Sequence, residues 1–209
     1  MAITLTGCSV KYLPRYEQVG AIPPGHVLVV SKVELRPKVN QQKDIEKIFR
    51  GQNAIKRGEV KFLTSPNVDK PVKKGAMIPF DINGGFDFNV SYKDFSFILM
   101  PPGKTFIRRG EVVLGTGVAS VSVSGGGAMT AHRSFRELYL WGDVKVEIPA
   151  DAKAVYIGNL IYNHDGKYST KVRVKDDYKK ARRALEKQKI PGIKGKDLKK
   201  KLARVIKQN

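Results

Sequence analysis

The residues of this sequence that could act in catalysis or bind a metal are few and widely spaced. The chain of 209 residues has one cysteine, Cys8, and three histidines, His26, His132 and His164, in separate turn-like stretches. A single thiol cannot form an internal disulfide, and the histidines lack the spacing of metal ligands. His132 is near Ser134 in sequence, but there is no GxSxG nucleophile motif. We therefore expect no catalytic residue, no metal and no cofactor, and a protein that is not an enzyme.

The single cysteine ends the tetrapeptide LTGC near the start of the chain. This stretch resembles the lipobox of bacterial lipoproteins, with Leu5, Thr6, Gly7 and Cys8 at the matching positions. The resemblance implies that the thiol of Cys8 carries a diacylglycerol group and that Cys8 becomes the first residue of the mature protein. Each buried methylene group contributes about 0.8 kcal/mol, so two or three acyl chains hold a protein stably on a membrane.

The residues on either side of the box bear on export and location. Lipoprotein signals have a basic region and a longer apolar region before the box, and only Met1–Thr4 stand there. We expect such a segment to be encoded upstream of Met1, or to have been removed from the chain. Ser9 follows the cysteine, as in lipoproteins directed to the outer membrane of Gram-negative bacteria. The resemblance thus implies a place in the bacterial cell envelope, on the outer membrane and facing the periplasm.

The charge of the chain predicts an anionic partner. The sequence has 39 Lys and Arg residues against 19 Asp and Glu residues, a net charge of +20. Such a field favours anionic lipid, acidic glycan or nucleic acid. Half of the excess lies in residues 175–209, where Tyr178 is the one aromatic residue, so base stacking on this segment is weakly supported. An alternative is that this segment packs its apolar residues on the sandwich and leaves its charges in water. The candidate anion contacts are Lys179, Lys180, Arg182, Arg183, Lys199, Lys200, Lys201 and Arg204.

Alternating apolar and polar residues predict a mainly β protein. The stretch HVLVVSKVEL is the first expected strand, with Val27, Val29 and Val33 in the core. Turns are expected at Gly142–Asp143 and at Asp165–Gly166, the latter closing a two-residue hairpin. Roughly eight to ten short strands follow one another along the chain, a pattern typical of an antiparallel β-sandwich or barrel. We predict the sandwich.

Composition divides the chain into three parts. Residues 1–19 are interpreted as a signal remnant and tether, residues 20–175 as the β-sandwich domain, and residues 176–209 as a basic helical C-terminal extension. Within the second part, the spacing of Ile45, Ile48 and Phe49 favours a short helix.

The C-terminal extension is expected to hold two amphipathic helices. Asp176 and Asp177 are placed to cap the first of them, DDYKKARRALEKQK. The second stretch, KDLKKKLARVIKQN, has Leu198, Leu202 and Val205 on one side at helical spacing.

A second resemblance concerns the fold. The hairpin that begins AVYIGNL, the IPAD turn before it and the helix that follows Asp176 and Asp177 resemble the closing section of small bacterial envelope lipoproteins. That resemblance implies an immunoglobulin- or transthyretin-like sandwich, and it implies no activity.

The function expected from these features is that of a non-enzymatic lipoprotein of the cell envelope, acting as a binding or structural module. Its partners would be the membrane, through the lipid anchor, and an anionic lipid, a glycan or an envelope protein. Two alternatives remain open at this point. One is a basic nucleic-acid-binding protein of the cytoplasm, and the other is a hydrolase whose site is built from distant loops.

Overall fold

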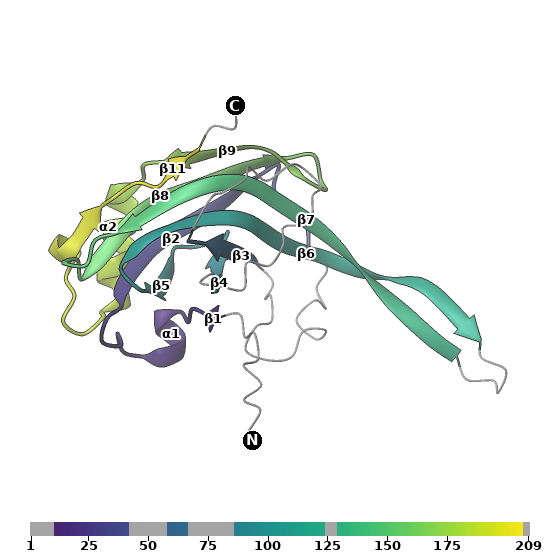
Figure 1. Ribbon diagram of the computed structural model, residues 1–209, viewed down its shortest axis with the longest axis horizontal. Coiled ribbons are helices and arrows are strands. Elements are labelled where there is room, and N and C mark those ends of the chain that lie inside the picture. Colours follow the sequence, from purple (N-terminus) through teal and green to yellow (C-terminus); the bar gives the residue numbers. More distant parts are fainter. Residues whose placement is uncertain (1–10, 42–57, 67–85, 124–128, 207–209) are drawn as a thin grey trace, which may run out of the picture.

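The computed structural model describes residues 11–41, 58–66, 86–123 and 129–206, and of Lys11 and residues 116–123 and 129–135 the backbone alone. Two β-sheets pack face to face, and a helix covers the outer face of the second (Figure 1). The expected β-sandwich with a short helix near the C-terminus is therefore confirmed. The elements are β1 (Lys11–Tyr12), α1 (Tyr16–Val19), β2 (Val27–Arg36), β3 (Glu59–Ser65), β4 (Phe86–Ser91), β5 (Ser96–Met100), β6 (Gly103–Val123), β7 (Met129–Ile148), β8 (Ala154–His164), β9 (Ser169–Lys175), α2 (Tyr178–Gln188), η2 (Gly195–Asp197), β10 (Leu198–Lys200) and β11 (Arg204–Val205).

Parallel pairing occurs at the edge of the first sheet, between β1 and β4, and at the centre of the second. The first has the order β1-β4-β3-β6-β7-β11, and its central strands pair antiparallel. The second has the order β10-β8-β2-β5, with β9 also paired to β8. In it β2 runs parallel to β8, from Leu28 opposite Ala154 to Arg36 opposite Asn163. The second sheet is thus mixed, a difference from the expected antiparallel arrangement, because apolar alternation reports which face is buried and not which way a neighbour runs.

Strand β2 lies at the centre of the second sheet and is buried on both faces over its first half. Val27, Val29 and Val33 face the interior between the sheets, as expected from their alternation. Leu28 and Val30 point to the opposite face, where they pack beneath α2. This two-sided burial explains why the strand begins as an apolar run rather than as a strict alternation.

Helix α2 forms where it was expected, and its two acidic residues act differently at its start. Asp177 occupies the N-cap position, but its side chain makes no capping hydrogen bond. The carboxylate of Asp176 instead accepts a hydrogen bond from the backbone N–H of Tyr178 at 2.9 Å. Ala181 and Leu185 are buried against the second sheet, which confirms the apolar stripe of the helix.

The second amphipathic helix, predicted over residues 196–209, does not form in the described part of that segment. The described residues form the short η2 and then β10 and β11. Between these strands the backbone N–H of Lys201 donates to the carbonyl of Tyr156, and that of Ala203 donates to Ile157. Pairing with β8 and β7 satisfies the backbone of this segment while Leu198 and Ala203 become buried, so the packing overrides the helical spacing of the apolar residues.

Each end of the described chain joins the two sheets. At the N-terminal end β1 pairs with β4 of the first sheet, and the carbonyl of Pro14 accepts from the N–H of Leu99 in the second. At the C-terminal end β10 pairs with β8, and then β11 pairs with β7. Residues 11–19, in the part interpreted as a tether, therefore contain β1 and α1 and belong to the packed fold.

The turn predicted at Gly142–Asp143 does not form, because β7 continues through these two residues. In the ladder with β6, Arg109 lies opposite Trp141 and Ile107 lies opposite Val144. Gly142 and Asp143 thus face the single residue Arg108, which is the arrangement of a β-bulge. Gly142 has a φ of +151°, and a Cβ atom there would lie 2.7 Å from a methyl group of Val172.

The hairpins of the fold include one that was expected and one that extends beyond the body. The turn at Asp165–Gly166 is confirmed, since the Asp165 carboxylate accepts hydrogen bonds from the N–H groups of Lys167 and Tyr168 at 2.9 and 2.7 Å. Strands β6 and β7 pair as far as Val123 opposite Met129 and project as a two-stranded ribbon (Figure 1). The helix expected around Ile45–Phe49 lies outside the described residues.

Candidate anion-binding pocket

The residues considered for catalysis do not come together in the described part of the chain. His26 lies beside the carbonyl of Pro24, and His164 contacts the carbonyl of Pro37 at 2.7 Å. His132 lies where the backbone alone is described. Within the described ranges no three His, Cys, Asp or Glu side chains are grouped so that they could hold a metal ion. None of the described helices has the length and apolar character needed to span a membrane.

The proposed lipid attachment residue, Cys8, lies outside the described residues. In the sequence, Ser9 and Val10 separate it from Lys11, the first residue of β1.

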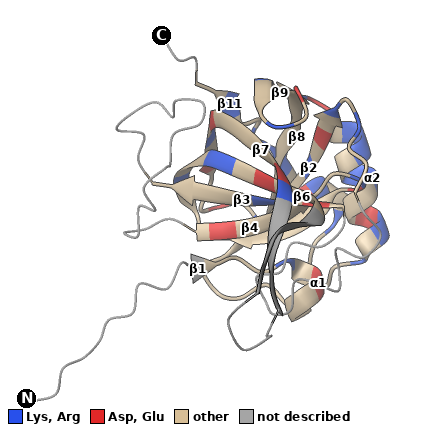
Figure 2. Cartoon of the chain, turned by 90° about the vertical axis from the view of Figure 1, so that its right-hand side faces the viewer, with Lys and Arg blue, Asp and Glu red and all other residues tan. Residues whose placement is uncertain are grey.

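The eight basic residues predicted to contact anions do not form one site. Helix α2 contributes Lys179, Lys180, Arg182 and Arg183 to the surface over the second sheet (Figure 2). The remaining four, Lys199, Lys200, Lys201 and Arg204, lie on or between β10 and β11, with Arg204 on the edge strand of the first sheet.

Half of these eight residues already have carboxylate partners. The ion pairs join Lys199 to Asp151, Lys200 to Asp176, Lys201 to Glu147 and Arg182 to Glu186, at 2.5, 3.1, 3.4 and 3.2 Å. Hydrogen bonds from the Tyr178 N–H and from Lys200 hold the pKa of Asp176 below its usual value. This surface is therefore a mixture of paired and unpaired charges rather than a continuous basic track.

A pocket of about 530 Å³ opens beside the second sheet, near the start of α2. Its position follows from the length of β5, which pairs with β2 only from Val27 to Ser31. Opposite Ser31, β5 begins, and the turn before it connects β5 to β4 in the first sheet. No described strand therefore pairs with that edge of β2 beyond Ser31. The lining consists of Lys32, Glu34, Leu35, Lys38, Val39, Tyr92, Lys93, Phe95, Asn159, Lys175, Asp177 and Lys180.

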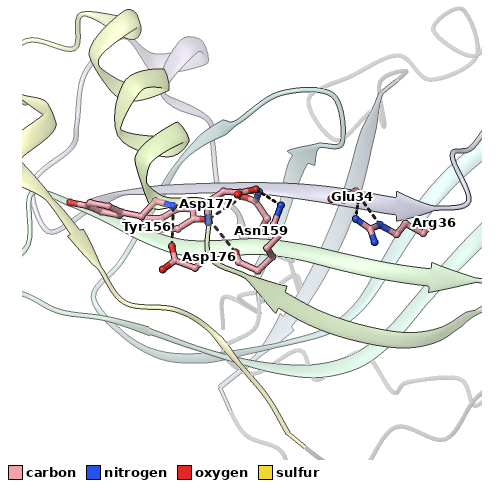
Figure 3. A network of polar contacts seen from close by, with 8 residues as sticks. Glu34, Arg36, Tyr156, Asn159, Asp176 and Asp177 are labelled. Atoms are coloured by element: carbon pink, nitrogen blue, oxygen red, sulfur yellow. Dashed lines mark hydrogen bonds and ion pairs between the residues drawn. The ribbon is translucent and has the colours of Figure 1, made fainter.

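The lining of the pocket has an excess of positive charge. Five lysines face two carboxylates, and both carboxylates are already engaged. Glu34 forms an ion pair with Arg36 at 2.5 Å, and Asp177 accepts a hydrogen bond from Asn159 at 2.8 Å (Figure 3). Lys175 lies 3.3 Å from the Asp177 carboxylate.

The other four lysines of the lining make no ion pair with any residue that the structure describes: Lys32, Lys38, Lys93 and Lys180. They come from β2, from the segment after it, from the β4–β5 turn and from α2. Four lysines that line one cavity without a carboxylate partner give it a positive potential, so the cavity favours a bound anion.

One wall of the pocket is held by a buried tyrosine. The hydroxyl of Tyr156 accepts a hydrogen bond from the backbone N–H of Asp177 at 2.8 Å and lies 3.3 Å from the side-chain oxygen of Asn159 (Figure 3). The Tyr156 ring also packs edge-on against Phe95, which lines the pocket, with ring centres 6.4 Å apart. The tyrosine thus fixes the start of α2 relative to β8.

Alkaline pH should weaken the fold through this tyrosine. Burial raises the pKa of the Tyr156 phenol to about 12, from an ordinary value of 10.0. Between these values the unfolded chain loses its proton while the folded chain keeps it, so the free energy of unfolding falls as pH rises from about 10 toward 12. Urea unfolding at stepped pH should show a shallower fall for Tyr156→Phe than for the wild type. Equal slopes for the two proteins would contradict this assignment.

Sequence reasoning found only Lys180 among the lysines that line the pocket. The other four stand singly in strands and turns that are distant in sequence, where nothing marks them as a group. One signal was present: Lys32 and Glu34 follow an apolar run with alternate spacing, which indicates that the outer face of β2 becomes polar there.

Comparison with protein-family models, curated proteins and solved structures finds no match to this chain.

Proposed function

We propose that this chain is a non-enzymatic, lipid-anchored module of the bacterial cell envelope that binds an anionic ligand. The observation that carries the binding role is the pocket, whose four unpaired lysines face no free carboxylate among the described residues. The anchor rests on the tetrapeptide LTGC, in which Cys8 is the attachment residue.

The position of Cys8 determines what an anchor there would do. Three residue steps separate it from Lys11, and an extended chain spans at most about 11 Å over that length. Since β1 pairs with β4, acyl chains on Cys8 would hold this edge of the first sheet close to the lipid surface. The body would then face the periplasm from the outer membrane, without a long flexible linker.

The anchor is tested on the protein isolated from its native host. We expect mass spectrometry to find Cys8 at the amino terminus, carrying a diacylglycerol group, and the protein in the membrane fraction. A Cys8→Ala variant, expressed with the native upstream sequence, should lose the label from radioactive palmitate and leave the membrane fraction. An unmodified Cys8 within an intact N-terminus would rule the anchor out.

A further inference from the structure

We infer that the pocket binds a small organic anion of at least two negative charges that also carries an apolar ring. This inference rests on the proposed binding role and names its ligand class, and it is independent of the anchor at Cys8.

The charge of the ligand follows from the unpaired lysines. Lys32, Lys38, Lys93 and Lys180 line the cavity from four segments of the chain, so a ligand in the cavity would lie among several basic residues. An anion with one charge would leave most of this positive charge uncompensated, whereas a phosphate ester offers several acceptor oxygens to several ammonium groups. The pocket also lies at the start of α2, where the helix dipole adds positive potential.

The apolar part of the ligand follows from the rest of the lining. Leu35, Val39, Tyr92 and Phe95 contribute hydrocarbon surface to the same cavity. Tyr92 and Val39 are partly buried and pack against the core between the sheets, and Phe95 packs against the cluster beneath α2. An inorganic anion would leave the exposed part of this surface in contact with water, while an aromatic or aliphatic ring would cover it.

The size of the cavity argues for a small molecule rather than a polymer. A volume of about 530 Å³ lies within the range of roughly 300–1,000 Å³ found for small-molecule sites. A nucleic acid or acidic glycan would instead need a long basic track. The basic residues of α2, β10 and β11 do not provide one, because half of them are paired with carboxylates.

The ligand class is tested by calorimetric titration of the full chain with three probes in about 0.15 M salt. The probes are 1-naphthyl phosphate, inorganic phosphate and the neutral 1-naphthylmethanol. We expect naphthyl phosphate to bind at least about tenfold more tightly than either of the other probes, because only it contacts both the lysines and the apolar lining of the pocket. Equal binding of the neutral alcohol would overturn the anionic assignment, and equal binding of inorganic phosphate would overturn the apolar one.

Two pairs of charge substitutions place the binding in the pocket. Lys32→Gln with Lys93→Gln removes two lining lysines, and we expect naphthyl phosphate to bind about tenfold or more weakly. The matched control, Lys171→Gln with Lys187→Gln, removes two exposed lysines outside the lining and should change binding by about twofold or less. An equal loss of affinity in the two double variants would indicate general attraction to the basic surface and would overturn the inference. Absence of naphthyl phosphate binding by the wild type would also overturn it.

The apolar contact has its own variant. Phe95→Ala should weaken the binding of naphthyl phosphate more than that of inorganic phosphate, and so reduce the preference between them. Circular dichroism confirms that each variant is folded before it is titrated. Failure of these titrations would leave acylation of Cys8 intact, and absence of acylation would leave the titrations intact, so the two proposals are separable.

Discussion

Replacing Asp143 with alanine is expected to destabilise the protein by about 3–5 kcal/mol, because the change leaves a buried guanidinium without its carboxylate. The Nε atom of Arg108 lies 2.6 Å from Oδ1 of Asp143, and the two side chains are only 10% and 1% exposed. Both residues lie at the β-bulge between β6 and β7, where Arg108 alone faces Gly142 and Asp143. Urea unfolding of the wild type and the variant measures the difference.

An exposed ion pair of similar length is the matched control. Lys199 and Asp151 are 2.5 Å apart, but their side chains are 48% and 76% exposed. Asp151→Ala should therefore cost far less than Asp143→Ala, because water solvates the lysine that remains. A double variant, Arg108→Leu with Asp143→Ala, should recover part of the loss by removing the buried charge. If Asp143→Ala cost no more than Asp151→Ala, burial of the pair would not determine its contribution.

The same bulge shows where local sequence reasoning is limited. Gly142–Asp143 has the composition of a turn, and propensity alone favours a reversal of the chain there. The long ladder between β6 and β7 continues on both sides of it, so the extra residue is absorbed within a strand. Asp165–Gly166 has the same composition and does close a hairpin, since β8 and β9 have no continuation beyond it. The difference lies in the partner strands, which are distant in sequence.

Burial could be predicted where pairing could not. Periodicity located the core residues of β2 and indicated that α2 is amphipathic, because each depends on one element and its own period. The direction of β8 beside β2 depends instead on how more than a hundred intervening residues cross over, and neither strand carries that information. The C-terminal segment changed from an expected helix to β10 and β11 for the same reason, since β8 and β7 supply its partners.

The pocket could not be predicted from the sequence, because it results from the different lengths of two paired strands, β2 and β5. It exists where β5 stops pairing with β2 at Ser31, and its lysines come from segments before and after that point. The basic residues that sequence reasoning did select, in α2 and after it, were conspicuous as a cluster. Clustering in sequence favours helices with solvated faces, whereas convergence in space depends on the fold.

Replacing Gly158 with alanine is the second change with a large expected effect, about 2–5 kcal/mol of destabilisation. Gly158 follows the irregularity in the β2–β8 ladder, where Val30 lies opposite Tyr156 and Ser31 lies opposite Gly158. Its φ of +101° lies in the left-handed region, and a Cβ atom would lie 2.4 Å from Cγ1 of Val174. Alanine would thus have two costs: its backbone would be strained, and its Cβ atom would collide with Val174 of β9.

Two further variants separate the strain from the collision. Gly166 has almost the same φ, +102°, but no atom lies within 4 Å of where its Cβ would be. Gly166→Ala should therefore show the backbone strain alone, about 1–3 kcal/mol, and should cost less than Gly158→Ala. In a Gly158→Ala background, Val174→Ala should cost less than it does in the wild type, because it removes the colliding methyl group. Equal costs at the two glycines, together with additive effects of the alanines at 158 and 174, would show that β9 yields to the new side chain. The close approach of β9 to β8 would then not be what requires glycine at this position.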